Sequence, residues 1–221
     1  MADDYDPRIQ EAIEFLKLAN EADTMNRQEA LEDLKFGGEI TTAEIGDNTT
    51  IRECATINRG TSDKQKTVIG KNCLIMAYVH VAHDCIIGDN CILANAVQMA
   101  GHVTVGDFAI IGGSSAIHQF ASIGRHVMIS GGSLVRKDVP PFTKAGREPL
   151  SYAGINSVGL RRREFNDAQV AEIQDIYRYV YLKGLNNQEA LNQIESNIPQ
   201  SAYRDEIVDF IRNSERGIMK G

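Results

Sequence analysis

Several residue types that help to classify a protein are scarce in this chain of 221 residues. It contains no Trp, its aromatic residues amount to 6%, and no apolar run is long enough to cross a membrane. The first residues, Met1-Ala2-Asp3-Asp4-Tyr5-Asp6, are acidic where a secretory leader would be basic and then apolar. The sequence therefore predicts a cytoplasmic protein with no integral membrane segment.

The net charge is −7, and it is unevenly distributed. Eight basic residues and two acidic ones occur between positions 125 and 163. They are Arg125, Arg136, Lys137, Lys144, Arg147, Arg161, Arg162 and Arg163, with Asp138 and Glu148. This basic zone is compatible with an anionic partner or a phosphate group, and equally with an ordinary solvated surface. Nucleic acid is a poor fit, because the chain as a whole is acidic and the zone lacks interleaved aromatic residues.

The most regular feature of the sequence is an aliphatic residue at every sixth position. Twelve consecutive positions follow this rule: Ile69, Ile75, Val81, Ile87, Leu93, Met99, Val105, Ile111, Ile117, Ile123, Ile129 and Val135. Ile45, Ile51 and Ile57 continue the phase upstream, and Asp63 interrupts it. A period of six matches neither a strand nor a helix alone. It is typical of a parallel β-helix, in which the chain turns a corner after each short strand.

Three hexads form one coil of eighteen residues, with the aliphatic side chains inside and about 4.8 Å between coils. Cys73 and Cys91 are eighteen residues apart, so we expect them to stack in neighbouring coils. The four cysteines, which also include Cys54 and Cys85, form no CxxC or zinc-ribbon spacing. In a reducing compartment they are predicted to be buried structural thiols.

The pattern divides the chain into three parts. Residues 1–31 form an acidic segment with helical periodicity over about 7–21 and a second short helix at 26–34. Residues 32–141 form the β-helix, with a polar loop at 58–67 and an end at Pro140-Pro141, because proline cannot donate to a ladder. Residues 142–221 form a connector and a helical domain. Its helices are predicted around the apolar stripe of Val170, Ile173, Ile176, Tyr177 and Val180, at 187–196 and at 201–213.

Four of the five histidines, His80, His83, His102 and His118, fall within about three coils. A buried histidine needs partners for both ring nitrogens, so a core has little use for four of them. Asp84 directly follows His83, and a carboxylate beside an imidazole can fix its tautomer. The set therefore favours a functional site.

Two chemistries are compatible with these residues. In one, a histidine is a general base that activates a hydroxyl for attack on an acyl group, and backbone amides at Ala100-Gly101 or Gly112-Gly113 form an oxyanion hole. In the other, three histidines bind zinc, as in a hydratase of the γ-carbonic anhydrase type. His80-x-x-His83 gives weak support to a metal site, but the His-x4-His pair of those hydratases is absent from the sequence.

Longer motifs are more specific. They are Thr56-Ile57-Asn58-Arg59-Gly60-Thr61, Val79-His80-Val81-Ala82-His83-Asp84-Cys85, Met99-Ala100-Gly101-His102-Val103, Ile117-His118-Gln119-Phe120, Asp138-Val139-Pro140-Pro141, Gly154-Ile155-Asn156, Gly159-Leu160-Arg161-Arg162-Arg163 and the tail from Ile207 to Gly217. In this order they resemble the acyl-(acyl-carrier-protein)–UDP-N-acetylglucosamine O-acyltransferases, the first enzymes of lipid A synthesis, over roughly residues 32–219.

The resemblance implies a left-handed parallel β-helix that assembles as a homotrimer with active sites between subunits. By position, the catalytic residues would be His83 as general base, Asp84 as its orienting carboxylate and Gly101, whose amide would hold the oxyanion. The substrate-binding residues would be Asp33, Lys35, His80, His102, His118, Gln119, Gly131 and Arg162. Of these, Gly131 matches a position that helps to set acyl-chain length, and Arg162 a position near the nucleotide phosphates.

The implied reaction moves a 3-hydroxyacyl group from acyl carrier protein to the 3-hydroxyl of UDP-N-acetylglucosamine, with no metal and no cofactor. The acidic carrier protein suits the basic zone. Family members begin with further coils, whereas this sequence has the acidic segment 1–31. We therefore expect an exposed β-helix end and a reduced cleft. The zinc hydratase and an inactive β-helix scaffold remain the alternatives.

Overall fold

Residues 39–221 are described by the computed structural model of the chain. The helices predicted at 7–21 and 26–34, and the predicted substrate contacts Asp33 and Lys35, lie outside the described residues. Thr41–Gly221 forms a unit of its own and is described by itself.

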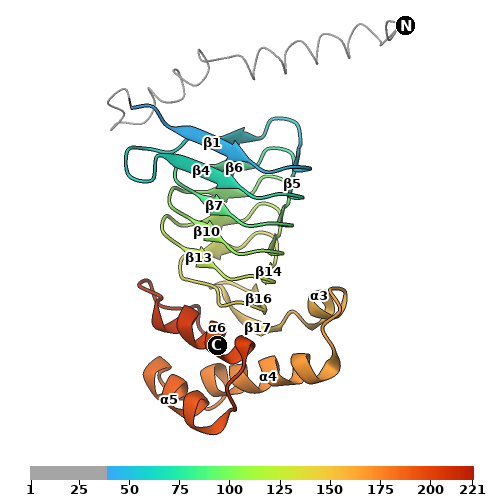
Figure 1. The fold of residues 1–221 in the computed structure, drawn as a ribbon, viewed down its shortest axis with the longest axis vertical. Helices are drawn as coiled ribbons and strands as arrows, with labels where there is room; N and C mark the ends of the chain where they lie inside the picture. Colours follow the sequence, from blue (N-terminus) through green and yellow to red (C-terminus); the bar gives the residue numbers. More distant parts are fainter. Residues whose placement is uncertain (1–38) are drawn as a thin grey trace, which may run out of the picture. The chain divides into compact units, whose positions relative to one another are not determined.

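The hexads fold into a parallel β-helix whose strands make three sheets (Figure 1). The first sheet has the order β1-β4-β7-β10-β13, with β1 Thr42–Ile45, β4 Lys66–Ile69, β7 Ile86–Ile87, β10 Thr104–Val105 and β13 Ser122–Ile123. The second has the order β17-β16-β14-β11-β8-β5-β2, with β2 Thr50–Ile51, β5 Leu74–Ile75, β8 Ile92–Leu93, β11 Ile110–Ile111, β14 Met128–Ile129, β16 Thr143–Gly146 and β17 Ser151–Ile155. The third has the order β15-β12-β9-β6-β3, with β3 Thr56–Ile57, β6 His80–Val81, β9 Gln98–Met99, β12 Ala116–Ile117 and β15 Leu134–Val135.

From β1 to β15, consecutive strands belong to different sheets, so each coil has three corners. Corner 1 joins the first sheet to the second and comprises residues 70–73, 88–91, 106–109 and 124–127. Corner 2 joins the second sheet to the third at 76–79, 94–97, 112–115 and 130–133. Corner 3 joins the third sheet to the first at 82–85, 100–103 and 118–121.

The register confirms the coil length of eighteen residues, since His80 pairs with Gln98 and Ile86 with Thr104. The first coil is longer, because Thr56 pairs with His80 at a separation of twenty-four. The extra residues belong to the predicted polar loop, which interrupts the aliphatic phase at Asp63. This loop runs from the end of β3 to Lys66, where β4 begins.

The aliphatic row points into the coils and forms the core. Its members from Ile69 to Val135 are buried. At the first described coil the same row is open, with Ile45 47% and Ile51 40% exposed. Cys73 and Cys91 are stacked and buried as predicted, and the Cys91 amide donates to Cys73 Sγ at 3.4 Å. Cys85 is also buried, but the prediction is wrong for Cys54, which is exposed because it lies in the open first coil.

The parallel ladder extends further than the sequence predicted. Pro140-Pro141 does not end it, because β16 follows the two prolines and pairs in parallel with β14, through Met128 and Lys144. The pattern ends when β17 adds to β16 in the antiparallel direction. Proline interrupts the hexad phase here, but the ladder resumes two residues later.

The C-terminal domain contains α3 Ser157–Arg161, α4 Asp167–Tyr181, α5 Asn187–Asn197 and α6 Ala202–Arg212. Asn166 and Asn186 begin α4 and α5 with capping boxes, and the Ser201 side chain caps α6. The predicted stripe is buried on α4 and packs with residues of α5 and α6 in a second core. None of the helices in residues 39–221 has the length and apolar composition needed to cross a bilayer.

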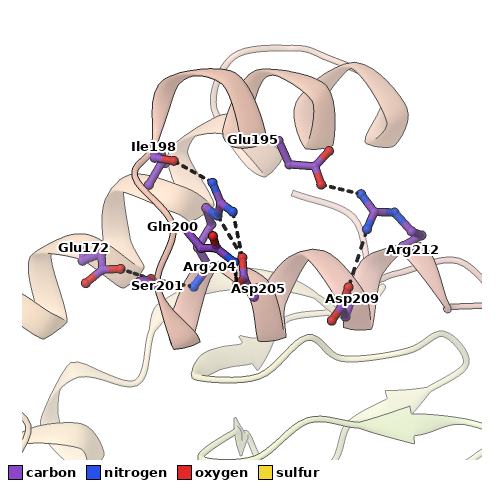
Figure 2. Close-up of polar contacts among 9 residues, drawn as sticks. All are labelled: Glu172, Glu195, Ile198, Gln200, Ser201, Arg204, Asp205, Asp209 and Arg212. Atoms are coloured by element: carbon purple, nitrogen blue, oxygen red, sulfur yellow. Dashed lines mark hydrogen bonds and ion pairs between the residues drawn. The ribbon is translucent and has the colours of Figure 1, made fainter.

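Polar contacts hold α6 against its neighbours (Figure 2). Arg204 donates to the carbonyl of Ile198 at 2.9 Å, and Arg212 donates to Glu195 on α5 at 2.8 Å. The Ser201 hydroxyl contacts Glu172 on α4. The helices therefore form a stable base for the last coils.

Candidate active site

The centre of the site is His83, which corner 3 places directly after β6. Its Nδ1 lies 2.9 Å from Oδ2 of Asp84. The His83 side chain is 29% exposed, whereas the Asp84 side chain is completely buried. When Nδ1 carries the proton and donates to Asp84, Nε2 is left as an acceptor. This is the tautomer that a general base needs.

Asp84 is held by the polar loop. The Thr61 amide donates to Asp84 Oδ1 at 2.8 Å, and the Thr61 hydroxyl donates to Oδ2 at 2.6 Å. Burial raises the pKa of this carboxyl, but hydrogen bonds from Thr61 and His83 and the charge of His102 outweigh burial, so the pKa of Asp84 is lowered. Asp84 is therefore an anionic anchor for the imidazole.

His102 lies one coil after Asp84 along the chain. Its Nε2 is 3.5 Å from Asp84 Oδ2, and its Nδ1 is 3.4 Å from Asp63 Oδ2. The rings of His83 and His102 meet edge to face with centroids 5.1 Å apart, and Phe120 stacks on His102 at 4.7 Å. The predicted pair thus shares one buried carboxylate.

Gly101 is covered by the His83 ring. A Cβ atom at this position would lie 2.5 Å from Cε1 and 2.7 Å from Nε2 of His83. Only glycine lets the imidazole approach the backbone so closely. Among the hydrogen bonds formed within residues 39–221, none has the Gly101 amide as donor. A free N–H group thus lies beside the candidate base.

Three further predicted residues lie near corner 3 without joining this cluster. His80 faces outward on β6, its Nδ1 is 2.8 Å from Thr56 Oγ1, and burial lowers its pKa. His118 and Gln119 follow β12, with His118 Nδ1 3.0 Å from the Gln119 carbonyl oxygen. By the register, Gln119 lies one coil after Gly101 along the chain.

Two predicted residues lie elsewhere. Gly131 is in corner 2, on the opposite side of the third sheet from His83. Arg162 is the exposed C-cap residue of α3. One chain therefore does not bring together all the residues that the resemblance implies.

The sequence did not single out Thr61, Asp63 or Phe120 as site residues. The only signal for the first two was the polar loop, whose break in phase indicated a segment leaving the coil. Phe120 follows the predicted pair His118-Gln119, and its 54% exposure is the structural sign that it faces a site.

The zinc alternative requires three histidine ligands. Within residues 39–221, the group of possible ligand atoms that lies close enough together consists of His83, Asp84 and His102, all within 4.8 Å of one another. His80 is occupied by Thr56. The predicted set of three histidines is therefore not formed in this unit.

The basic zone is partly neutralised by acidic residues from other parts of the chain. Glu206 on α6 binds Arg125 at 2.7 Å, and Asp167 binds Arg161 at 3.0 Å. Arg136 is 3.6 Å from Glu148. Arg147 and Arg162 are exposed. Because the other three arginines are paired with carboxylates, the net positive charge of this surface is smaller than the sequence indicated.

A β-helix of hexapeptide repeats with an imidazole–carboxylate pair at a corner defines a hexapeptide-repeat transferase. The family model "Bacterial transferase hexapeptide (six repeats)" matches residues 66–101, and "Udp N-acetylglucosamine O-acyltransferase; Domain 2" matches residues 138–219. The chain belongs to the family of acyl-(acyl-carrier-protein)–UDP-N-acetylglucosamine O-acyltransferases, as its relatives show.

The relative from Chlorobaculum tepidum is 60% identical over 182 residues, which cover 82% of this chain and 69% of that protein. The relative from Aquifex aeolicus is 56% identical over 193 residues, 87% of this chain and 74% of that protein. Among solved structures, the UDP-N-acetylglucosamine acyltransferase LpxA from Bacteroides fragilis has a TM-score of 0.84 and 52% identity, covering 86% of this chain and 74% of that chain. The fold class, a left-handed parallel β-helix with C-terminal helices, is confirmed.

Proposed function

We propose that the chain transfers a 3-hydroxyacyl group from acyl carrier protein to the 3-hydroxyl of UDP-N-acetylglucosamine, the first step of lipid A synthesis. The main support is the half-buried His83 ring, with one nitrogen anchored on a buried carboxylate. A base in this environment keeps a fixed tautomer and remains open to substrate.

In the proposed reaction, His83 Nε2 takes the proton of the sugar hydroxyl as its oxygen attacks the thioester carbon. The carbonyl oxygen becomes an oxyanion, to which the Gly101 amide donates a hydrogen bond. The intermediate then collapses, the C–S bond breaks, and His83 returns the proton to the departing carrier thiolate. The products are the sugar ester and the free carrier thiol. Asp84 stabilises the imidazolium between these steps.

The remaining predicted residues are assigned to substrate binding. His80, His102, His118 and Gln119 line the same side of the β-helix as His83 and would contact the sugar nucleotide. Arg162 would approach its phosphates. Asp33 and Lys35 keep the same predicted role.

The position of Gly131 is proposed to help to set the length of the acyl chain, with glycine leaving the path open. A Cβ atom here would lie 3.1 Å from the Gly113 carbonyl oxygen, so even a small side chain has little room toward the backbone. Any larger side chain would project outward from corner 2. It would then occupy the path of an acyl chain that runs along this corner.

We infer that the chain assembles as a homotrimer. The outward position on neighbouring strands of the second sheet is apolar in four coils: Leu74, Ile92, Ile110 and Met128. An apolar row on an outer sheet face indicates a contact surface. Placing Gly131 of one subunit near His83 of another would also reunite residues that a single chain separates. Light scattering of the purified chain should give three times the monomer mass, and Ile110→Glu should give monomers.

The exposed part of the basic zone, including Arg147 and Arg162, would attract the acidic carrier protein. The cytoplasmic location and the boundary after residue 31 stay predictions.

The direct test is an assay of the purified chain with UDP-N-acetylglucosamine and carrier proteins that bear defined 3-hydroxyacyl groups, with mass spectrometry of the product. We expect the acylated sugar nucleotide, formed fastest with one chain length. A folded chain that forms no ester with any carrier would contradict the proposal and favour the inactive scaffold.

A further inference from the structure

Asp84 faces more polar groups than it needs to hold the single proton on His83 Nδ1. Oδ2 of this carboxylate accepts a hydrogen bond from the Thr61 hydroxyl and faces a nitrogen of each of two imidazoles. His102 Nε2 is 3.5 Å away, too far for a good hydrogen bond. The three side chains thus bring two nitrogens and one carboxylate oxygen within 4.8 Å of one another.

These distances are close to the separations between metal ligands. Ligand atoms about 2.1 Å from a tetrahedral zinc ion lie about 3.4 Å from one another. The nitrogens of His83 and His102 lie 2.9 and 3.5 Å from Asp84 Oδ2, and all three ligand atoms lie within 4.8 Å of one another. Two histidines and one carboxylate are a common ligand set for divalent transition metals, with a fourth position left open.

We propose that His83, Asp84 and His102 bind a divalent transition-metal ion such as Zn²⁺, and that the bound ion inhibits acyl transfer. The inhibition rests on the proposed function, whereas the binding does not. An ion bound to Nδ1 of His83 takes the place of the proton shared with Asp84. The remaining proton of the neutral ring then lies on Nε2, so His83 can no longer accept the proton of the sugar hydroxyl. The metal therefore acts by reversing the tautomer that catalysis needs.

The surroundings support entry and retention of an ion. The His83 side chain is 29% exposed and gives a route from solvent, whereas His102 is 13% and Asp84 0% exposed. The Thr61 amide holds the carboxylate through its other oxygen, Oδ1, as hydrogen-bond partners of metal-ligating carboxylates commonly do. Asp63 lies 3.4 Å from the other nitrogen of His102 and would orient that ring.

The binding test uses Co²⁺ as a visible probe for the full-length chain freed of metal. Titration should give one Co²⁺ per chain and the absorption bands of a four-coordinate nitrogen and oxygen site. His102→Gln and Asp84→Asn should each weaken binding by at least about tenfold. His80→Gln and His118→Gln are the matched controls, because each removes an imidazole from the same face outside the cluster, and they should keep the bands. Circular dichroism of each variant shows whether it is folded.

Binding at a different site would appear as bands that survive in folded His102→Gln and Asp84→Asn, and this would overturn the proposal, as would the absence of binding at millimolar Co²⁺. The second arm measures acyl transfer with added Zn²⁺, which should fall and recover with a chelator. Bands in a chain that shows no transferase activity in its metal-free state would uphold the metal site while refuting the proposed function. Undiminished transfer by a chain saturated with Zn²⁺ would refute the inhibition.

Discussion

His126 and His102 occupy equivalent positions at two different corners of the same β-helix. Both have left-handed φ angles, 57° and 60°, and both stack on a phenylalanine, at 4.9 Å on Phe108 and 4.7 Å on Phe120. Their environments differ. His126, at corner 1, is 3% exposed and packed among aromatic rings and two arginines, whereas His102 faces two carboxylates. The repeat therefore sets the backbone position of each imidazole, and the neighbouring residues determine its protonation and its possible partners.

The backbone amides of the two corners show the same contrast. At corner 1, Asp107 Oδ1 of one coil accepts a hydrogen bond from the Asp89 amide of the preceding coil, at 2.8 Å. Asp89 does the same for Lys71 at 2.9 Å. At corner 3, glycine occupies the corresponding position 101, and its amide has no such partner among the described residues. One corner uses its amides for stability, and the other leaves one beside the candidate base.

Replacing Gly101 should therefore have a large effect on activity. In Gly101→Ala the new Cβ would overlap the His83 ring and displace it, and the oxyanion would lose its donor geometry. We expect kcat to fall by about 10²–10³-fold, measured by steady-state acyl transfer. Circular dichroism of the variant shows whether it is folded. Wild-type kcat in Gly101→Ala would show that the close approach is irrelevant.

The buried His126 should make stability depend on pH. Burial, with repulsion from Arg125 and Arg163, lowers its pKa from 6.5 to about 4. Between about pH 6.5 and pH 4, this histidine is protonated in the unfolded chain but neutral in the folded chain. The free energy of unfolding therefore falls as the pH drops through this range, by roughly 3 kcal/mol at most.

His126→Phe removes this group and the unpartnered buried Nδ1. Chemical denaturation at several pH values should show a smaller acid loss in the variant than in the wild type. Parallel curves for the two proteins between pH 7 and 4 would contradict the assignment.

Thr61 tests the role of the loop in positioning the pair at corner 3. Thr61→Val deletes the hydroxyl donor to Asp84 but keeps the backbone donor, so the carboxylate and the His83 ring lose part of their alignment. We expect kcat to fall about tenfold at an unchanged KM, a magnitude typical of lost supporting contacts. Thr61→Ser restores the donor and should restore kcat. A Thr61→Ser variant as impaired as Thr61→Val would contradict this role of the hydroxyl.

The smallest predicted effect concerns corner 1. Asp107→Ala removes the acceptor of the Asp89 amide and should lower the free energy of unfolding by about 1 kcal/mol, with kcat unchanged. Asp107→Asn keeps an oxygen acceptor and should lose less. A marked loss of kcat in Asp107→Ala would show that the division of labour between the corners is wrong.

The sequence predicted the β-helix because its inward residues return at a fixed interval, and each interval is short enough to be recognised without tertiary information. It also predicted the pair His83-Asp84, since the two are adjacent, and the stack of Cys73 on Cys91. It did not predict that Thr61 contacts Asp84, twenty-three residues away in the sequence. The loop does not follow the six-residue repeat, so the repeat cannot place its side chains. The pairing of β16 after Pro141 was also missed, since a proline signals only a local break.

The charge pattern misled for the same reason. The basic zone was counted along the chain, whereas Glu206 approaches Arg125 from eighty-one residues away. Helices α4, α5 and α6 were predicted, because the apolar stripe around Ile173 and the helical periodicity that follows it are local signals.

The central claim is that His83 removes the proton of the attacking hydroxyl, and turnover of His83→Ala tests it most directly. Acyl transfer by the wild type and this variant should be compared at equal concentration, with thermal unfolding measured on the same samples. The account predicts a fall in kcat of about 10²–10⁴-fold with no loss of thermal stability. A His83→Ala protein that turns over at the wild-type rate would contradict it.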